Sequence, residues 1–178
     1  MSLTISGDSP SLSGTFQGGT LTLGTAQNTT SGTAVDFTGI PSWAKRITVM
    51  LNGVSTNGSS PVRVQIGSGS VQSSGYAGFN LAYSSTGVSG QNISAAFELW
   101  TASGEGVAAT RSGMLQLCLQ NVTNTWVAHG KSGLSNAAYG GDVAGSVTLS
   151  GTLDRIRLTT VNGTDTFDAG SVNILYEG

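Results

Sequence analysis

Few residues of this chain could perform acid, base or nucleophilic chemistry. His129 is the only histidine and Cys118 the only cysteine among 178 residues. A Ser/His/Asp triad could form only around His129, and a site built on several histidines is excluded. Cys118 lies within an apolar run, where burial disfavours the reactive thiolate, and a lone cysteine forms no intrachain disulfide. We therefore interpret Cys118 as a packing residue and His129 as a strand-end or loop residue.

The nine carboxylates offer two further possibilities. Glycosidases place two acids around the bond they cleave, and Glu98 and Glu105 flank a Thr-Ala-Ser-Gly segment that could bring them together across a hairpin. Asn162, Asp165 and Asp168 place the oxygen ligands that Ca²⁺ prefers in one short loop, although their spacing matches no EF-hand. Because Asp is also a common structural residue of turns, we expect no enzyme activity, no metal and no cofactor, with Ca²⁺ near Asp165 and Asp168 left open.

Aromatic residues in two Gly-, Ser- and Asn-rich segments favour binding rather than catalysis. The segments span residues 73–83 and 135–142, and we interpret both as loops. The candidate receptor-binding residues are Tyr76, Phe79, Tyr83, Asn136 and Tyr139. A tyrosine among small polar residues can stack on an apolar sugar face or protein side chain while neighbouring amides donate adaptable hydrogen bonds. The alternative is that the rings only cover the ends of the fold.

Composition limits the partners. Only 9% of the residues are charged and the formal net charge is -2, which gives no electrostatic basis for gripping a phosphate backbone. We therefore expect no nucleic-acid partner. No apolar run approaches the ~20 residues that span a bilayer, and the first residues lack the basic and apolar regions of a signal peptide. The sequence thus predicts a protein that is made in the cytoplasm and does not insert into a membrane.

Short alternating apolar segments dominate the chain. Around Ile47, Val49 and Leu51, apolar and polar residues alternate with the period of a strand that buries one face. Ten such segments recur between turn residues, and helix signals are almost absent. They are Val35–Phe37, Lys45–Val54, Val62–Gly67, Asn80–Ser84, Ile93–Thr101, Met114–Asn121, Trp126–His129, Val147–Ser150, Ile156–Val161 and Ser171–Tyr176. The pattern predicts an all-β protein, an antiparallel β-sandwich or jelly roll of about ten strands.

Turn signals and weaker segments give the domain organisation. A Ser-, Asn- and Gly-rich turn that includes Asn57-Gly58 joins the two strands of residues 34–67. Asn162-Gly163 follows another strand signal, and Asn-Gly is a frequent hairpin turn because both residues tolerate positive φ. Residues 1–33 contain only short, weak strand signals in a Ser-, Gly- and Thr-rich background. We expect residues 1–33 to form an N-terminal arm or attachment segment and residues 34–178 to form the sandwich domain.

Two blocks carry a resemblance to a known family. Residues 34–67, from Ala34-Val35-Asp36-Phe37 to Val64-Gln65-Ile66-Gly67, and residues 153–177 are similar to segments of bacteriophage and prophage tail-fibre proteins. In that family such segments open and end a β-rich distal domain. Residues 68–145 between the blocks resemble the family less, and a variable middle region is where such a domain would hold its specificity.

The resemblance implies a virion protein of the tail fibre or tail tip. Such a protein binds a glycan or an outer-membrane receptor on the host surface without catalysis. The family analogy also implies a homotrimer that contacts other virion proteins through the N-terminal arm. A capsid decoration or head-fibre protein is the second reading, and a glycan depolymerase spike is the third.

Overall fold

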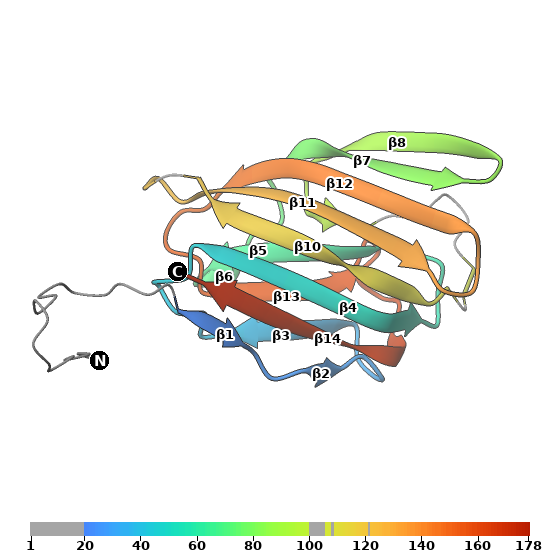
Figure 1. Cartoon of the computed structure of the whole chain (residues 1–178), viewed down its shortest axis with the longest axis horizontal. Coiled ribbons are helices and arrows are strands. Elements are labelled where there is room, and N and C mark those ends of the chain that lie inside the picture. The colour runs from blue at the N-terminus through green and yellow to red at the C-terminus, as the bar shows by residue number, and fades with distance from the viewer. Residues whose placement is uncertain (1–19, 100–105, 108, 121) are drawn as a thin grey trace, which may run out of the picture.

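The protein is a two-layer sandwich of antiparallel sheets (Figure 1). The computed structural model describes residues 20–99, 106–107, 109–120 and 122–178. Within these residues there are fourteen strands, and no helix there is long and apolar enough to span a membrane. The predicted all-β sandwich is confirmed, and several of the additional strands are only two or three residues long.

The two sheets differ in size. The large sheet has the order β1 (Leu21–Leu23), β14 (Phe167–Glu177), β4 (Arg46–Thr56), β10 (Arg111–Leu119), β11 (Thr125–Leu134), β12 (Tyr139–Thr148), β7 (Ala77–Ser84) and β8 (Gly87–Ile93), with β2 (Gln27–Asn28) also paired to β14. The small sheet has the order β3 (Ala34–Thr38), β13 (Arg155–Thr160), β5 (Val62–Ser68) and β6 (Ser70–Val71), with β9 (Phe97–Glu98) paired to β5. The core lies between these sheets.

The apolar residues of the predicted alternating segments form the core. Ile47 and Val49 of β4 and Val64 and Ile66 of β5 have no exposed surface and belong to one apolar cluster. Full burial of one such side chain contributes about 1.5–3 kcal/mol. The strand phase deduced around Val49 is therefore confirmed.

The two Asn-Gly turns are not hairpin turns. Each connects a strand of one sheet to a strand of the other, β4 to β5 and β13 to β14. The loops also hold each other, because Asp165 accepts hydrogen bonds from the Ser60 backbone N–H at 2.9 Å and from Asn162 Nδ2 at 2.6 Å. The Thr166 backbone N–H donates to Asn57 Oδ1 at 2.8 Å. The predicted pair of strands joined by the turn at Asn57-Gly58 is confirmed as β4 and β5. The hairpin prediction at Asn162-Gly163 was wrong, because a local turn signal does not determine whether the next strand pairs with the previous one or enters the other sheet.

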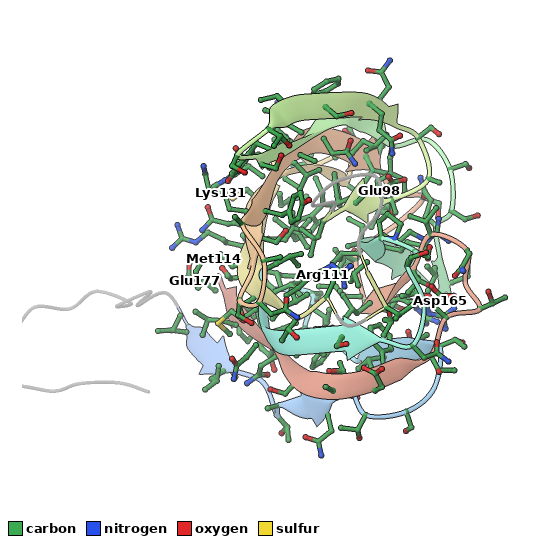
Figure 2. The ribbon with its side chains drawn as sticks, turned by 90° about the vertical axis from the view of Figure 1, so that its right-hand side faces the viewer. Glu98, Arg111, Met114, Lys131, Asp165 and Glu177 are labelled. Atoms are coloured by element: carbon green, nitrogen blue, oxygen red, sulfur yellow. The ribbon has the colours of Figure 1, made fainter. Side chains whose placement is uncertain are left out.

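Glycines on the inner face allow the large sheet to curve around the core. Gly145 of β12 lies opposite Gly78 of β7, and a Cβ atom on Gly145 would lie 2.7 Å from the carbonyl oxygen of Ala77. Gly130 of β11 is similarly close to Met114 O of β10. Figure 2 shows the large sheet curving from its β8 end at the top to its β14 end at the bottom. Glycine at such positions permits the close approach that a bent sheet requires.

Some segments differ from their predicted structure. The expected strand Ile93–Thr101 is instead the end of β8, a bend and the two-residue β9, and residues 100 and 101 lie outside the described residues. The expected loops contain strands, since β7 covers residues 77–84 and β12 begins at Tyr139. Part of the expected N-terminal arm pairs with the sandwich, because β1 and β2 form ladders with β14. Residues 1–19 of that arm lie outside the described residues.

Candidate functional site: the outer face of the large sheet

The outer face of the large sheet gathers two of the predicted aromatic residues. On β7, Asn80 and Ala82 point into the sandwich and are buried. Phe79, Leu81 and Tyr83 alternate with them and therefore lie on the outer face. Phe79 is 47% exposed and Tyr83 is 36% exposed. Both side chains are thus presented to solvent by a strand rather than by a loop.

Each of these rings lies over a glycine of a neighbouring strand. A Cβ atom on Gly90 of β8 would collide with the Phe79 ring, and one on Gly140 of β12 would collide with the Tyr83 ring. An aromatic side chain packed over a cross-strand glycine covers exposed backbone and loses its own rotational freedom. Packing against these glycines restricts the Phe79 and Tyr83 rings on one side, and a ring that is already restricted loses less conformational entropy when a ligand binds.

A shallow depression lies two strands away on the outer face. Its volume is about 460 Å³, and it is lined by residues of β10 and β11, including Met114, Gln116, His129, Lys131 and Gly133. Met114 lies directly opposite Lys131 in the ladder, and Gln116 lies opposite His129. Figure 2 shows Met114 and Lys131 on the same side of the sheet. The missing side chain of Gly133 leaves space beside these two pairs.

The polar groups of this depression are held by their neighbours. His129 Nε2 and Gln116 Oε1 are 3.1 Å apart, which requires the imidazole nitrogen to donate. Lys131 Nζ lies 3.2 Å from Asp142 Oδ1 of β12. The hydrogen bond from Lys131 to Asp142 raises the pKa of the Lys131 ammonium, so this exposed group stays charged at neutral pH. The depression therefore offers an amide, an imidazole and a permanent cation beside an apolar Met114.

Tyr76 does not belong to this surface. Its side chain is only 4% exposed and packs in the core, edge-on to Phe97 at a centroid distance of 5.0 Å. Burial raises the pKa of the Tyr76 phenol to about 12. The prediction that Tyr76 binds a receptor was wrong, because a ring enclosed between the sheets has no face left for a ligand.

Tyr139 and Asn136 are not on the same face of β7 and β12 as Phe79 and Tyr83, since Tyr139 has the opposite phase and Asn136 lies in the loop between β11 and β12. Tyr139 pairs with Ser84, which has the phase of the inward-pointing residues of β7, so Tyr139 projects from the opposite side of the sheet end from Tyr83. It is 43% exposed. Asn136 is exposed, and its Oδ1 accepts a hydrogen bond from the Thr110 backbone N–H at 3.2 Å. Receptor contact by Tyr139 or Asn136 stays a prediction, with Asn136 also serving as a loop cap.

The residues weighed for catalysis or metal binding have structural partners. Glu98 is nearly buried, and its Oε2 accepts hydrogen bonds from Gln91 Nε2 at 2.8 Å and Asn80 Nδ2 at 3.3 Å. Glu105, its proposed partner, lies outside the described residues. Cys118 is half-buried on the outer phase of β10 rather than in the core. Within the described residues, no group of three or more His, Cys, Asp and Glu side chains could hold a metal.

Sequence reasoning missed the depression. Its side chains come from two strands that pair in one register, and no single segment of the sequence shows which of them are neighbours. A usable signal existed in the run from Thr125 to Leu134, where Trp126 and Ala128 alternate with Val127 and His129. This alternation assigns His129 to the outer face, although not to Gln116.

The comparisons with known proteins give no relative for this site. No family model matches the chain, and no curated protein matches it.

Proposed function

We propose that this chain is a bacteriophage virion protein of the tail fibre or tail tip, and that the outer face of its large sheet binds the host cell surface. The proposal rests on the resemblance of residues 34–67 and 153–177 to tail-fibre proteins and on the chemistry of that face. In it, the large sheet supplies a rigid platform and the side chains of β7, β10 and β11 supply the contacts. The receptor is a glycan or an outer-membrane protein.

The single observation that carries the proposal is the pair of exposed, glycine-backed rings of Phe79 and Tyr83. Interfaces that bind without large rearrangement use rigid aromatic side chains, because a fixed ring contributes contact area at little entropic cost. The depression lined by Met114, His129 and Lys131 adds hydrogen-bonding groups nearby. Such a surface suits a partner that presents both apolar faces and hydroxyl or acidic groups.

Binding without catalysis is supported by the partners of the ionisable groups. A general-base histidine is usually oriented by a carboxylate, whereas the partner that the structure gives His129 is the neutral amide of Gln116. The Glu98 carboxylate is occupied by two side-chain amides. We therefore propose an adhesin rather than a glycan-cleaving spike.

Binding to bacterial cells tests the proposal. Fluorescently labelled protein is mixed with a panel of strains, including mutants that lack surface glycans, and the bound fraction is compared with that of Tyr83→Ala. We expect wild-type protein to bind at least one strain and Tyr83→Ala to bind several-fold more weakly, since one lost aromatic contact contributes about 1 kcal/mol and multivalency amplifies the difference. Val161→Ala is the matched control. Val161 is an exposed apolar residue directly after β13, and this variant should bind like wild type.

Other outcomes separate the alternatives. Absence of binding to every strain, together with labelling of phage heads by an antibody against the chain, would replace this proposal with a capsid role. Release of reducing ends from host polysaccharide would show a depolymerase. The homotrimer is part of the proposal, and light scattering that gives the mass of one chain at micromolar concentration would remove it.

A further inference from the structure

Strand β8 is an edge strand without the usual protection. It lies at the end of the large sheet and, among the residues that the structure describes, pairs only with β7, in a register that runs without a bulge from Gly87 to Ile93. Six of its seven residues are exposed, all but Ile93. The strand has no charged residue and no proline. Natural proteins usually protect such edges with lysine, proline, a bulge or a short strand, because unpaired backbone groups invite pairing with another chain.

The opposite side of the sandwich is protected. The other end of the large sheet is β1, which has only three residues. The β3 edge of the small sheet is covered in part, because Gln27 Nε2 donates a hydrogen bond to the Asp36 carbonyl oxygen at 2.9 Å. At the far end of the small sheet, β6 has only two residues. Among the edge strands that the structure describes, β8 is therefore the one that is both long and without a charged residue.

We propose that two copies of this chain associate by pairing β8 with β8 in antiparallel orientation. The register that pairs all seven residues has its two-fold axis at Gly90, the middle residue of the strand. Every second residue of β8 directs its N–H and C=O away from β7, and these groups would form the new ladder. Because β7 and β8 contain no Asp, Glu, Lys, Arg or His, the two hairpins meet without charge repulsion.

The side chains of β8 are self-complementary in this register. Gly87 lies opposite Ile93 of the partner subunit, Val88 opposite Asn92 and Ser89 opposite Gln91, which places a smaller residue against a larger one in each pair. Gln91 Nε2 already donates to Glu98 Oε2 at 2.8 Å, so the hydroxyl of Ser89 would donate to Gln91 Oε1 across the ladder. The two Gly90 residues face each other at the axis, where neither has a side chain that would separate the strands.

The position of Phe79 is the second observation that favours a second copy. Its ring already reaches over Gly90, yet remains half exposed. Opposed residues of an antiparallel pair have Cα atoms about 4.5–5.5 Å apart, so the two Phe79 rings would meet above the Gly90 pair, within the range of favourable aromatic contacts. Pairing through β8 would thus bury a large apolar side chain that the single chain leaves in water.

A charge-swap experiment at the β8 edge tests this contact. In Val88→Lys/Asn92→Lys, each lysine would face a lysine of the partner subunit, and like charges directly opposed destabilise a strand pair. A two-fold contact doubles the assembly that carries it, so the homotrimer proposed above would pair into six chains. In sedimentation velocity over a concentration series, we therefore expect this variant to have half the wild-type mass. Val88→Glu/Asn92→Glu should behave in the same way alone, and an equimolar mixture of the two variants should recover the wild-type mass.

Leu21→Lys/Leu23→Lys, on the β1 edge, is the matched control and should leave the mass unchanged. Circular dichroism and thermal melting confirm that each variant is folded. Equal masses for the wild type and the β8 lysine variant would overturn the proposal, as would a mixture of lysine and glutamate variants that fails to recover the wild-type mass. Pairing through β8 would remove Phe79 from the receptor-binding surface and leave Tyr83 on it. The two proposals therefore fail separately, because a chain that does not pair through β8 still presents both rings to cells, and loss of cell binding leaves the mass of the assembly unchanged.

Discussion

The hydroxyl of Tyr76 accepts a hydrogen bond from the backbone N–H of Ile66 at 2.9 Å. It also donates to the carbonyl oxygen of Gln72 at 3.1 Å. One side chain thus holds the loop before β7 against the central strand of the small sheet. The ring and hydroxyl of Tyr76, which the sequence suggested would bind a receptor, therefore stabilise the sandwich instead.

Removal of the Tyr76 hydroxyl should lower stability without changing recognition. Tyr76→Phe leaves the Ile66 N–H and the Gln72 carbonyl without this buried partner, which costs about 1–3 kcal/mol of unfolding free energy. Tyr76→Ala also removes the ring and should cost about 3–5 kcal/mol. Urea unfolding measures both values. Weaker cell binding by folded Tyr76→Phe, with unchanged stability, would return Tyr76 to the binding surface.

Alkaline pH should destabilise the wild type more than Tyr76→Phe. Burial raises the pKa of Tyr76 from 10.0 to about 12, so the unfolded chain loses this proton first as the pH rises. The contribution of the neutral phenol is complete below pH 10 and is lost between about pH 10 and 12, which amounts to about 2–3 kcal/mol. Unfolding free energies measured from pH 8 to 11 should fall more steeply for the wild type. Parallel curves for the two proteins would contradict this.

The phase of β4 gives a prediction about solubility. Val49 is fully buried between Leu115 of β10 and Ile174 of β14. Val49→Asp places an unpaired carboxylate in this core, a cost of several kcal/mol against a typical domain stability of ~5–15 kcal/mol. We expect the variant to be insoluble. Thr48→Asp, one residue earlier and on the outer phase, should remain soluble with nearly unchanged melting.

Acid should weaken the pair formed by Asp36 and Arg157. Two parallel hydrogen bonds of 2.7 Å join the side chains, and the bond from Arg157 is the largest cause that holds the pKa of Asp36 below its ordinary value of 3.8. The lowered pKa stabilises the fold above about pH 4, and this contribution disappears as the pH falls through the lowered value. Because both side chains are partly exposed, Asp36→Asn should cost only about 0.5–1 kcal/mol at pH 7. The difference between wild type and variant should shrink as the pH falls below 4 and through the lowered pKa of Asp36, as melting temperatures can show.

The curvature of the large sheet should depend on its inner glycines. In Gly145→Val, the new Cβ atom would lie 2.7 Å from Ala77 O and 2.9 Å from Gly78 Cα, so the side chain would collide with β7. Overpacking of this kind costs about 1–3 kcal/mol. Gly87→Ala has nothing within 4 Å of its new methyl group and should melt like the wild type. Equal melting of the two variants would show that the sheet relaxes around position 145.

The sequence predicted what depends on local alternation and missed what depends on pairing. β4, β5, β13 and the second half of β14 were found because each places alternate apolar residues in the core, such as Ile47 and Val49 of β4 and Val172 and Ile174 of β14. β8 gave no signal, since an exposed edge strand that buries only Ile93 has no apolar alternation to show.

The candidate site was also predictable only in part, because its residue types are visible in the sequence and its cross-strand contacts are not. Phe79 and Tyr83 were found as exposed aromatics, but their support by Gly90 and Gly140 depends on cross-strand contacts. Tyr76, seven residues before Tyr83, is buried instead, because the chain bends before β7 and directs this side chain between the sheets. No residue-level pattern in a Gly- and Ser-rich stretch distinguishes a ring that will be enclosed from one that will lie on a strand.

The pairing of β4 with β14 constrains how the chain can fold during synthesis. These neighbours are separated by more than a hundred residues, and β4 also needs β10 on its other side. At a typical translation rate of about 5–20 residues per second, the apolar face of β4 waits about 6–24 s after leaving the ribosome before β14 has been made. During that interval Ile47, Val49 and Leu51 have no final partner on that side, so the nascent chain is open to chaperones and to misassembly with other nascent copies.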